Sequence, residues 1–185
     1  MVNELRIYFE GDNRLKPGFH AFMKEIVEAA RKRQCRFRLV EAKGTPVQDF
    51  HDALKTHPDA WNVLLLDSDA PVKGSLADLC RTKKIDPKHE ASVFWMVQVM
   101  EAWFLADVSG LRAFYGDRLQ VDWNPKVEEI PKDDAIAALK KLGREYHKTK
   151  HAPKLLAVID PAAVRKAAPN CDRIFRLILT ALSKD

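Results

Sequence analysis

The chain has 185 residues, and 31 Lys and Arg against 26 Asp and Glu give it a formal net charge of +5. A hydrophobic content of 46% and a charged content of 31% are typical of a globular protein, and this length favours one compact domain. No stretch approaches the ~20 apolar residues of a membrane span, the N-terminus lacks an export-signal pattern, and three widely spaced cysteines argue against a disulfide scaffold. We therefore expect a cytoplasmic protein with no membrane partner, whose charge permits nucleic acid as a partner without requiring it.

The first third of the chain predicts two strands and two helices. Residues 5–9 alternate and are β-branched or aromatic, which predicts a strand. The Pro-Gly pair at 17–18 then opens a helix with one apolar stripe that ends at the basic run 31–33. A second strand is expected over 36–41, followed by a turn and a helix that runs through Leu54.

The middle of the chain carries the clearest strand. Residues 61–66 are apolar without alternation, which is typical of a strand covered on both faces, as in a parallel sheet. A basic loop over 81–88 precedes a fourth strand over 92–96, and a helix is expected from Gln98 to Leu111. Strands separated by helices predict an α/β fold with a largely parallel, Rossmann-like sheet flanked by helices.

The pattern changes in the last third of the chain. Asn-Pro at 124–125 and Ile-Pro at 130–131 predict loops, and the chain beyond Lys132 is expected to be helical or irregular. We therefore divide the chain into an α/β core over 1–116 and a C-terminal helical extension over 117–185. The extension is expected to pack on the core, so that the whole forms one compact domain.

Acidic residues follow two of the predicted strands. Glu10 comes after the first strand, and Asp67-Ser68-Asp69 comes directly after the buried third strand. Ligand sites of open parallel sheets lie beyond the carboxyl ends of the strands, and carboxylates two residues apart share a face if the chain stays extended. Such oxygen ligands suit Mg²⁺ or Mn²⁺, and phosphate chemistry accompanies these ions. An acid at a strand end is also commonly a turn former or helix cap, so that interpretation stays open.

Glu101 is a further candidate, because it stands alone in an apolar helical run that ends near Asp107. A carboxylate on a mostly buried helix is costly unless it is paired or bound to a metal ion. Pairing with an arginine or a solvent-facing position is the alternative to a functional role for Glu101. For Asp107, near the end of the run, a structural role is favoured.

Basic residues occur in two places that would suit phosphate. Arg144, Lys148 and Lys150 belong to a cationic run, which forms either a solvated surface or a contact with a nucleic-acid backbone. A lysine of this run would stabilise charge on a transferring phosphoryl group. Arg14 and Lys16 follow the acidic end of the first strand and are also candidate phosphate contacts.

Several strings along the chain point to a family. They occupy residues 10–11, 15–19, 67–69, 96–107 and 114–116. Together they resemble domain of unknown function 4276, a bacterial family, and the Met-Glu-Ala-Trp-Phe-Leu-Ala-Asp string is the most specific of them. A first strand ending in Glu-Gly and a later strand ending in Asp-x-Asp also resemble the Toprim fold of topoisomerases, primases, recombination proteins and overcoming-lysogenization-defect-type nucleases.

This resemblance implies a metal-dependent acidic site. In Toprim proteins the first-strand glutamate acts as general acid or base and the Asp-x-Asp aspartates hold Mg²⁺. The resemblance thus implies a catalytic role for Glu10, which would also face the metal ion, and ligand roles for Asp67 and Asp69. It implies that Glu101 is a further ligand or proton carrier, and that Lys148 or Lys150 is the transition-state lysine.

The leading hypothesis is a Mg²⁺- or Mn²⁺-dependent phosphodiesterase, a nuclease acting on DNA or RNA. Relatives of the family accompany ATPases in bacterial defence against phage, which implies the alternative of a non-catalytic Toprim-like subunit or sensor bound to an ATPase. A homodimer is the other protein partner considered. The topoisomerase pattern is incomplete, since Pro71 stands where a third acid would follow. A nucleotide-sugar transferase would leave Glu10 without a role, and a haloacid-dehalogenase-type phosphatase would need an aspartate in its place.

Overall fold

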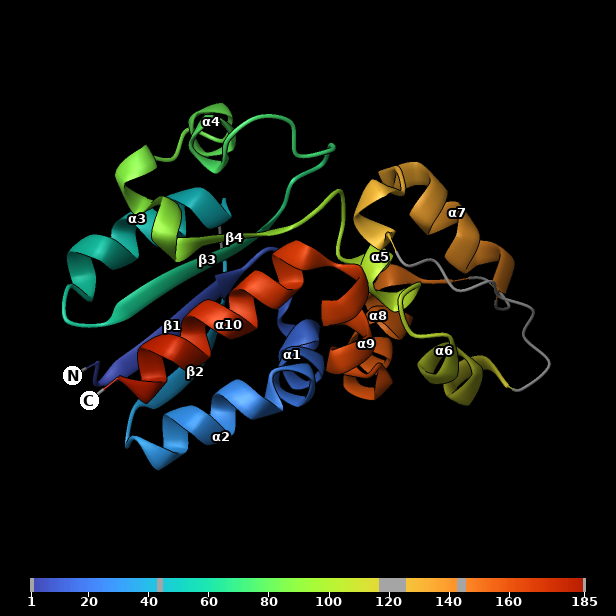
Figure 1. Cartoon of the computed structure of the whole chain (residues 1–185), viewed down its shortest axis with the longest axis horizontal. Coiled ribbons are helices and arrows are strands. Elements are labelled where there is room, and N and C mark those ends of the chain that lie inside the picture. Colours follow the sequence, from blue (N-terminus) through green and yellow to red (C-terminus); the bar gives the residue numbers. More distant parts are fainter. Residues whose placement is uncertain (1, 43–44, 117–125, 143–145, 185) are drawn as a thin grey trace.

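A computed structural model describes residues 2–42, 45–116, 126–142 and 146–184 of the chain (Figure 1). Its strands and helices in chain order are β1 (Glu4–Phe9), η1 (Asn13–Leu15), α1 (Lys16–Phe22), α2 (Lys24–Lys32), β2 (Arg36–Glu41), α3 (Pro46–Thr56), β3 (Trp61–Asp67), α4 (Leu76–Thr82), η2 (Pro87–Ser92), β4 (Val93–Met96), α5 (Glu101–Phe104), α6 (Val108–Tyr115), η3 (Val127–Glu129), α7 (Lys132–Leu142), α8 (Lys148–Val158), α9 (Pro161–Ala167) and α10 (Pro169–Ser183).

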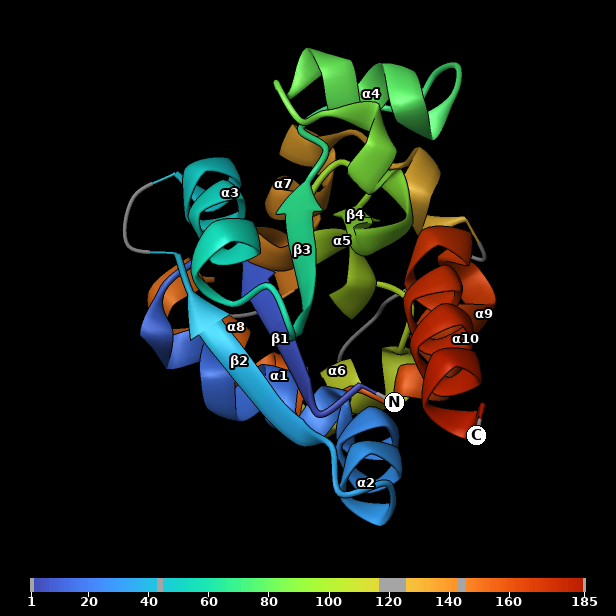
Figure 2. The same ribbon diagram turned by 90° about the vertical axis from the view of Figure 1, so that its left-hand side faces the viewer.

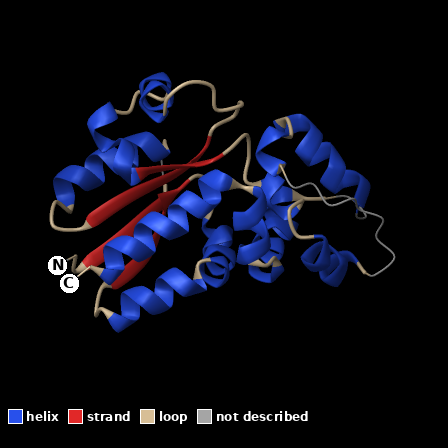
Figure 3. Ribbon diagram, in the orientation of Figure 1, coloured by secondary structure: helices blue, strands red, loops and turns tan. Residues whose placement is uncertain are grey.

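The four strands form one sheet in the order β2-β1-β3-β4, and every neighbouring pair is parallel (Figure 2). Ile7 of β1 lies opposite Leu39 of β2 and Val63 of β3, and Leu65 of β3 lies opposite Phe94 of β4. Helices surround the sheet (Figure 3). The predicted α/β fold with a parallel sheet flanked by helices and a helical C-terminus is therefore confirmed.

Both faces of the sheet are covered, as the apolar third strand predicts. Alternate residues of a strand point to opposite faces, so Leu65 belongs to one hydrophobic core and Leu64 to another. The larger core lies under α1, α2 and α10, and the smaller core lies under α3 and α4, on the other side of the strands in Figure 1. Burial of β3 on both faces fixes the direction in which its last residue leaves the sheet.

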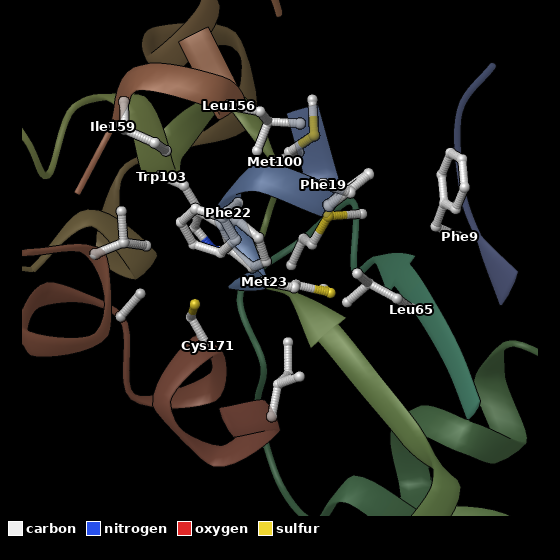
Figure 4. Packing of buried hydrophobic residues seen from close by; sticks show 14 of the residues in the cluster. Phe9, Phe19, Phe22, Met23, Leu65, Met100, Trp103, Leu156, Ile159 and Cys171 are labelled. Carbon is white, nitrogen blue, oxygen red and sulfur yellow. The ribbon is translucent and has the colours of Figure 1, made fainter. Parts of the chain in front are cut away.

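The helices α5 to α9 gather beyond the carboxyl ends of the strands (Figure 1). They share the larger core with the N-terminal helices: the Phe22 ring of α1 stacks on Trp103 of α5 with centroids 5.3 Å apart (Figure 4). The same ring meets Phe175 of α10 edge-on. Gly18 lets α1 approach α8 closely, since a Cβ there would lie 2.5 Å from the carbonyl oxygen of Pro153. The boundary expected at residue 116 therefore divides a chain whose two parts share one core, and the division itself stays a prediction.

Three predicted elements differ from the structure. The first expected helix is interrupted at Met23, whose backbone leaves the helical region (φ −92°, ψ 21°). In the expected basic loop over 81–88, residues 81–82 belong to α4 and residues 87–88 belong to η2, so that only 83–86 connect the two helices. The α4 helix begins with a capping box, in which the Ser75 and Asp78 side chains each accept the other residue's backbone N–H.

The third difference is the helix expected to begin at Gln98. That residue has a φ of 64°, which a helix does not accommodate, so α5 begins at Glu101. A second break at Asp107 separates α5 from α6. The predicted loop at 130–131 lies between η3 and α7, whereas the one at 124–125 lies outside the described residues. No helix in the described part of the chain is long and apolar enough to cross a membrane.

Candidate active site

The ends of β1 and β3 bring two carboxylates together at the carboxyl edge of the sheet. The ladder between these strands continues one residue beyond β1, since the Glu10 N–H donates to the Leu65 carbonyl at 3.0 Å. The Glu10 side chain then folds across to β3, where its Oε2 accepts the backbone N–H of Asp67 at 3.1 Å. The parallel pairing of two adjacent strands thus fixes Glu10 beside Asp67.

The start of α5 adds a third carboxylate. Asp67 Oδ1 accepts the backbone N–H of Met100 at 2.9 Å, which ties β3 to the turn before α5. Glu101 follows as the first residue of α5 and is fully buried. We call Glu10, Asp67 and Glu101 the acidic cluster.

Glu101 has two partners from the C-terminal part of the chain. The Tyr146 hydroxyl donates to Glu101 Oε1 at 3.1 Å, and Lys148 Nζ lies 3.4 Å from the same oxygen. The other oxygen, Oε2, is buried without a hydrogen-bond partner among the described residues. A buried carboxylate oxygen without a partner is costly, so this atom is suited to bind a ligand or a proton.

Electrostatics within the acidic cluster favour a proton or a cation. Burial, together with the charges of the Glu10 and Glu101 carboxylates, raises the pKa of Asp67 from 3.8 to about 7, although Lys148 and the Met100 N–H act in the opposite direction. Burial, followed by the charge of Glu101, raises the pKa of Tyr146 well above its ordinary value. Tyr146 is therefore a neutral donor at every physiological pH.

Lys148 connects the acidic cluster to the surface. It is the first residue of α8, its side chain is 54% exposed, and its ammonium lies against buried Glu101. A small cavity of about 100 Å³ opens beside it, between the loop after β1 and α8, and is lined by Gly11, Asp12, Leu15, Lys148, Thr149 and Pro153. A ligand in this cavity would contact both the cation and the loop that follows Glu10.

Asp69 lies in different surroundings. The chain does not stay extended after β3: Asp69 has a φ of 60°, in the left-handed region. Its carboxylate pairs with Lys83 at 2.7 Å on one oxygen and with Lys132 on the other. Burial alone would raise the pKa of Asp69, but the hydrogen bonds from the two lysines outweigh it and lower the pKa. We call Asp69, Lys83 and Lys132 the Asp69 bridge.

The structure therefore bonds Asp67 directly to Glu10 and to the backbone of Met100, the residue before Glu101, while it pairs Asp69 with cations. The condition under which both aspartates would share one face, an extended segment, is not met, because Asp69 has left-handed backbone. A role for Asp69 as a metal ligand stays a prediction.

Three of the four candidate nucleic-acid contacts lie within the described residues. Arg14 forms a two-pronged ion pair with Asp12, with contacts of 2.9 and 2.6 Å, in the loop after β1. Lys16 is half-buried at the start of α1, and Lys150 is exposed in the first turn of α8. Arg144 lies outside the described residues. The role of these residues in binding stays a prediction.

The donor chemistry of the acidic cluster fits a hard cation. Each carboxylate uses one oxygen in a contact with the protein, and the second oxygen of Glu101, Oε2, is buried without a hydrogen-bond partner among the described residues. Oxygen ligands of this kind are those that Mg²⁺ and Mn²⁺ prefer. No three His, Cys, Asp or Glu side chains among the described residues are grouped closely enough to hold an ion together.

Three residues near the site were not singled out by the sequence. Tyr146 and Lys132 lie far along the chain from the acidic strand ends, and no local pattern marks either of them. Lys83 belongs to the basic segment recognised before the fourth strand, but its spacing gives no sign of a contact with Asp69. The contacts of Tyr146 and Lys132 depend on how the C-terminal helices pack against the carboxyl edge of the sheet, and the contact of Lys83 depends on the position of α4.

Comparison with known proteins gives one assignment. No curated protein and no solved structure matches the chain significantly. A family model, Domain of unknown function (DUF4276), matches residues 12–178. That range includes both α5 and the aspartates after β3 and covers most of the chain, so the protein belongs to the DUF4276 family.

Proposed function

We propose that the protein is a Mg²⁺- or Mn²⁺-dependent phosphodiesterase, a nuclease that acts on DNA or RNA. The observation that carries this proposal is fully buried Glu101, whose Oε2 lacks a hydrogen-bond partner in the described structure, next to Asp67 with its raised pKa. Burial of several carboxylates is unfavourable unless a cation compensates them. A divalent ion would satisfy the cluster and is the cofactor that phosphodiester hydrolysis commonly uses.

Asp67 and Glu101 would hold the ion, with Glu10 as the third ligand or the residue facing it. An ion bound there would polarise the phosphodiester and lower the pKa of a coordinated water. Glu10 is half-buried and uses Oε2 for the Asp67 N–H, so its other oxygen would take a proton from the attacking water or return one to the leaving oxygen.

Lys148 and Tyr146 support this chemistry from the C-terminal side. The Lys148 ammonium is held near Glu101 yet remains half-exposed, so it can contact a phosphate oxygen and stabilise developing negative charge. The Tyr146 hydroxyl fixes the Glu101 carboxylate and stays neutral. Lys148 is a catalytic residue in this proposal, and Tyr146 is a positioning residue.

A Toprim relationship is part of the same proposal. A glutamate directly after β1 and an Asp-x-Asp that begins at the last residue of β3, on adjacent parallel strands, support it. We further propose that the protein acts in the cytoplasm, as its three widely spaced cysteines predict, and in defence against phage, as the family resemblance implies.

The test is a cleavage assay with plasmid DNA, single-stranded DNA and RNA in Mg²⁺, Mn²⁺ or EDTA. Asp67→Ala is expected to lower the cleavage rate on the order of a thousandfold, because metal stabilisation of the transition state is worth several kcal/mol. The control is Asp86→Ala, which removes a surface acid paired with Lys88 at 2.7 Å and should leave the rate unchanged. Full activity of Asp67→Ala would reject the assignment.

One observation favours a second candidate, a non-catalytic subunit or sensor bound to an ATPase. The carboxylates in the described ranges are not preassembled around an ion, and lysines pair with both Glu101 and Asp69. Absence of cleavage by the parent chain in every metal, together with co-purification of an ATPase, would support this candidate over the nuclease.

A further inference from the structure

We infer that the Asp69 bridge is a binding site for one phosphate of the substrate backbone, in which Asp69 positions Lys83 and Lys132 instead of binding the metal ion. For the identity of the substrate, this inference rests on the proposed phosphodiesterase function. It gives Asp69 a different role from Asp67, although the two residues belong to one Asp-x-Asp motif.

The backbone holds Asp69 away from the acidic cluster. The Asp69 N–H donates to the Gln98 carbonyl at 3.0 Å, and the Ser68 N–H donates to the Met96 carbonyl at 3.1 Å. The buried Ser68 hydroxyl also accepts the Gln98 N–H at 2.7 Å. These bonds attach the segment after β3 to the segment after β4, so the left-handed turn at Asp69 is built into the sheet edge.

Two cations from separate elements converge on Asp69. Lys83 is the C-cap of α4, and Lys132 is the first residue of α7. They approach different oxygens of the same carboxylate. Independent helices with a common target indicate that Asp69 determines where both ammonium groups lie.

The bridge has spare positive charge and is accessible. Two ammonium groups and one carboxylate give +2 − 1 = +1. An ammonium group has three N–H donors, and one from each lysine is used on Asp69. The side chains of Lys83 and Lys132 are 26% and 40% exposed, so phosphate oxygens can reach the remaining donors.

The acidic cluster creates a need for such a cation site. Three carboxylates repel a polyanion, and productive binding requires positive charge next to them. Lys132 is close enough to the cluster that the charges of Asp67 and Glu10, after that of Asp69, help to raise its pKa. A strand whose scissile phosphate lies at the cluster would therefore place a neighbouring phosphate at the bridge.

Two measurements on the full chain test this inference. The first is binding of Mn²⁺, followed by electron paramagnetic resonance. Asp67→Asn is expected to weaken Mn²⁺ binding by about tenfold or more, as loss of a ligand or its support does. Asp69→Asn should leave Mn²⁺ affinity unchanged. Equal losses in the two variants would make Asp69 a metal ligand and overturn the inference.

The second measurement is anisotropy of fluorescein-labelled DNA and RNA single strands in EDTA at several KCl concentrations. Lys83→Gln and Lys132→Gln should each flatten the slope of log K against log[KCl] by about 0.7, the value for one lost phosphate contact on a single strand. Lys132→Arg should retain the parent slope. Lys88→Gln is the matched control, because Lys88 also pairs with an aspartate but lies in η2, before the amino end of β4.

Unchanged slopes in both lysine variants, or no binding of either strand by the parent chain, would overturn the inference. Failure of the proposed function is distinguishable from this: a parent chain that binds no Mn²⁺ and cleaves nothing, yet shows the predicted slope changes, would retain the phosphate site and lose the nuclease. Unfolding temperatures of all variants establish that each one is folded.

Discussion

The acidic cluster and the Asp69 bridge each contain an aspartate, but the two carboxylates lie in opposite electrostatic surroundings. Asp67 is buried among carboxylates, and its pKa rises to about 7; Asp69, two residues later, is 44% exposed between two lysines, and its pKa falls. The difference arises from one left-handed residue and from the helices that pack around it. An Asp-x-Asp motif therefore does not by itself define two equivalent metal ligands.

Two buried acids near the ends of α5 also differ in their hydrogen bonding. Asp107, just beyond α5, is also buried, but its Oδ2 accepts the backbone N–H of Asp160 at 2.7 Å and so anchors the start of α9. Glu101, at the other end, keeps one oxygen without a partner in the described structure. Satisfaction of hydrogen bonds, more than burial, separates an acid with a structural role from one suited to chemistry.

We expect the largest effect on stability from the buried carboxyl group of Asp67. Its pKa of about 7 against 3.8 corresponds to about 4 kcal/mol at 1.36 kcal/mol per unit. Because the folded protein keeps this proton longer than the unfolded chain, stability should fall as the pH rises from about 4 to 7. Asp67→Asn should remove that loss and be more stable than the parent at pH 8 in EDTA.

Urea denaturation of the parent and Asp67→Asn across this pH range measures the difference. Titrating groups that do not interact with Asp67 contribute equally to both proteins and cancel in the comparison. If the stability of both proteins depends on pH in the same way, Asp67 is solvated, and neither burial nor the neighbouring carboxylates raise its pKa.

The next effect tests the hydrogen bond to Glu101. Tyr146→Phe removes the hydroxyl that donates to Glu101 and should cost about 1–3 kcal/mol, because a buried carboxylate then loses its neutral donor. The matched control is Tyr115→Phe, since the Tyr115 hydroxyl is buried without a hydrogen-bond partner among the described residues. That variant should be as stable as the parent, and an equal loss in both would show that the Tyr146 bond contributes nothing specific.

The smallest effect tests the bridge. Asp69→Asn breaks two partly exposed ion pairs, which solvent screening limits to less than about 1 kcal/mol. The pH dependence has the opposite sign to that of Asp67. Because the pKa of Asp69 is lower in the folded protein, its ion pairs stabilise the fold above pH 3.8, and this stabilisation is lost as the pH falls through the folded pKa. Denaturation at pH 7 should therefore show a slight loss, and a gain in stability there would contradict the assignment.

The strands and two of the three clustered carboxylates follow directly from the sequence. An unbroken apolar run predicts β3 as a strand covered on both faces. The carboxyl ends of parallel strands lie at one edge of the sheet, which places Glu10 and Asp67 together. Glu101 is recognisable because a lone acid in an apolar helix needs a partner. These inferences succeed since each depends on a local pattern or on a general property of the fold.

The rest depends on contacts that no local pattern encodes. The turn at Asp69 has a positive φ, which no neighbouring glycine marks in the sequence and which the long-range bond to the Gln98 carbonyl holds in place. Tyr146 and Lys132 reach the site because α7 and α8 pack on the carboxyl edge of the sheet, and the sequence does not specify that docking. The Ser75–Asp78 capping box is a local pattern that indicates the start of α4, so the basic residues that follow it begin within a helix.

The close contact between α1 and α8 at Gly18 has a consequence for biosynthesis. Tyr146 lies 45 residues after Glu101, and α1 completes its packing only when Pro153 arrives against it. A nascent chain therefore carries Glu101 without its hydroxyl and ammonium partners until α8 leaves the ribosome. Long-range contacts of this kind slow folding, and we expect the acidic cluster to mature only after α8 has been synthesised.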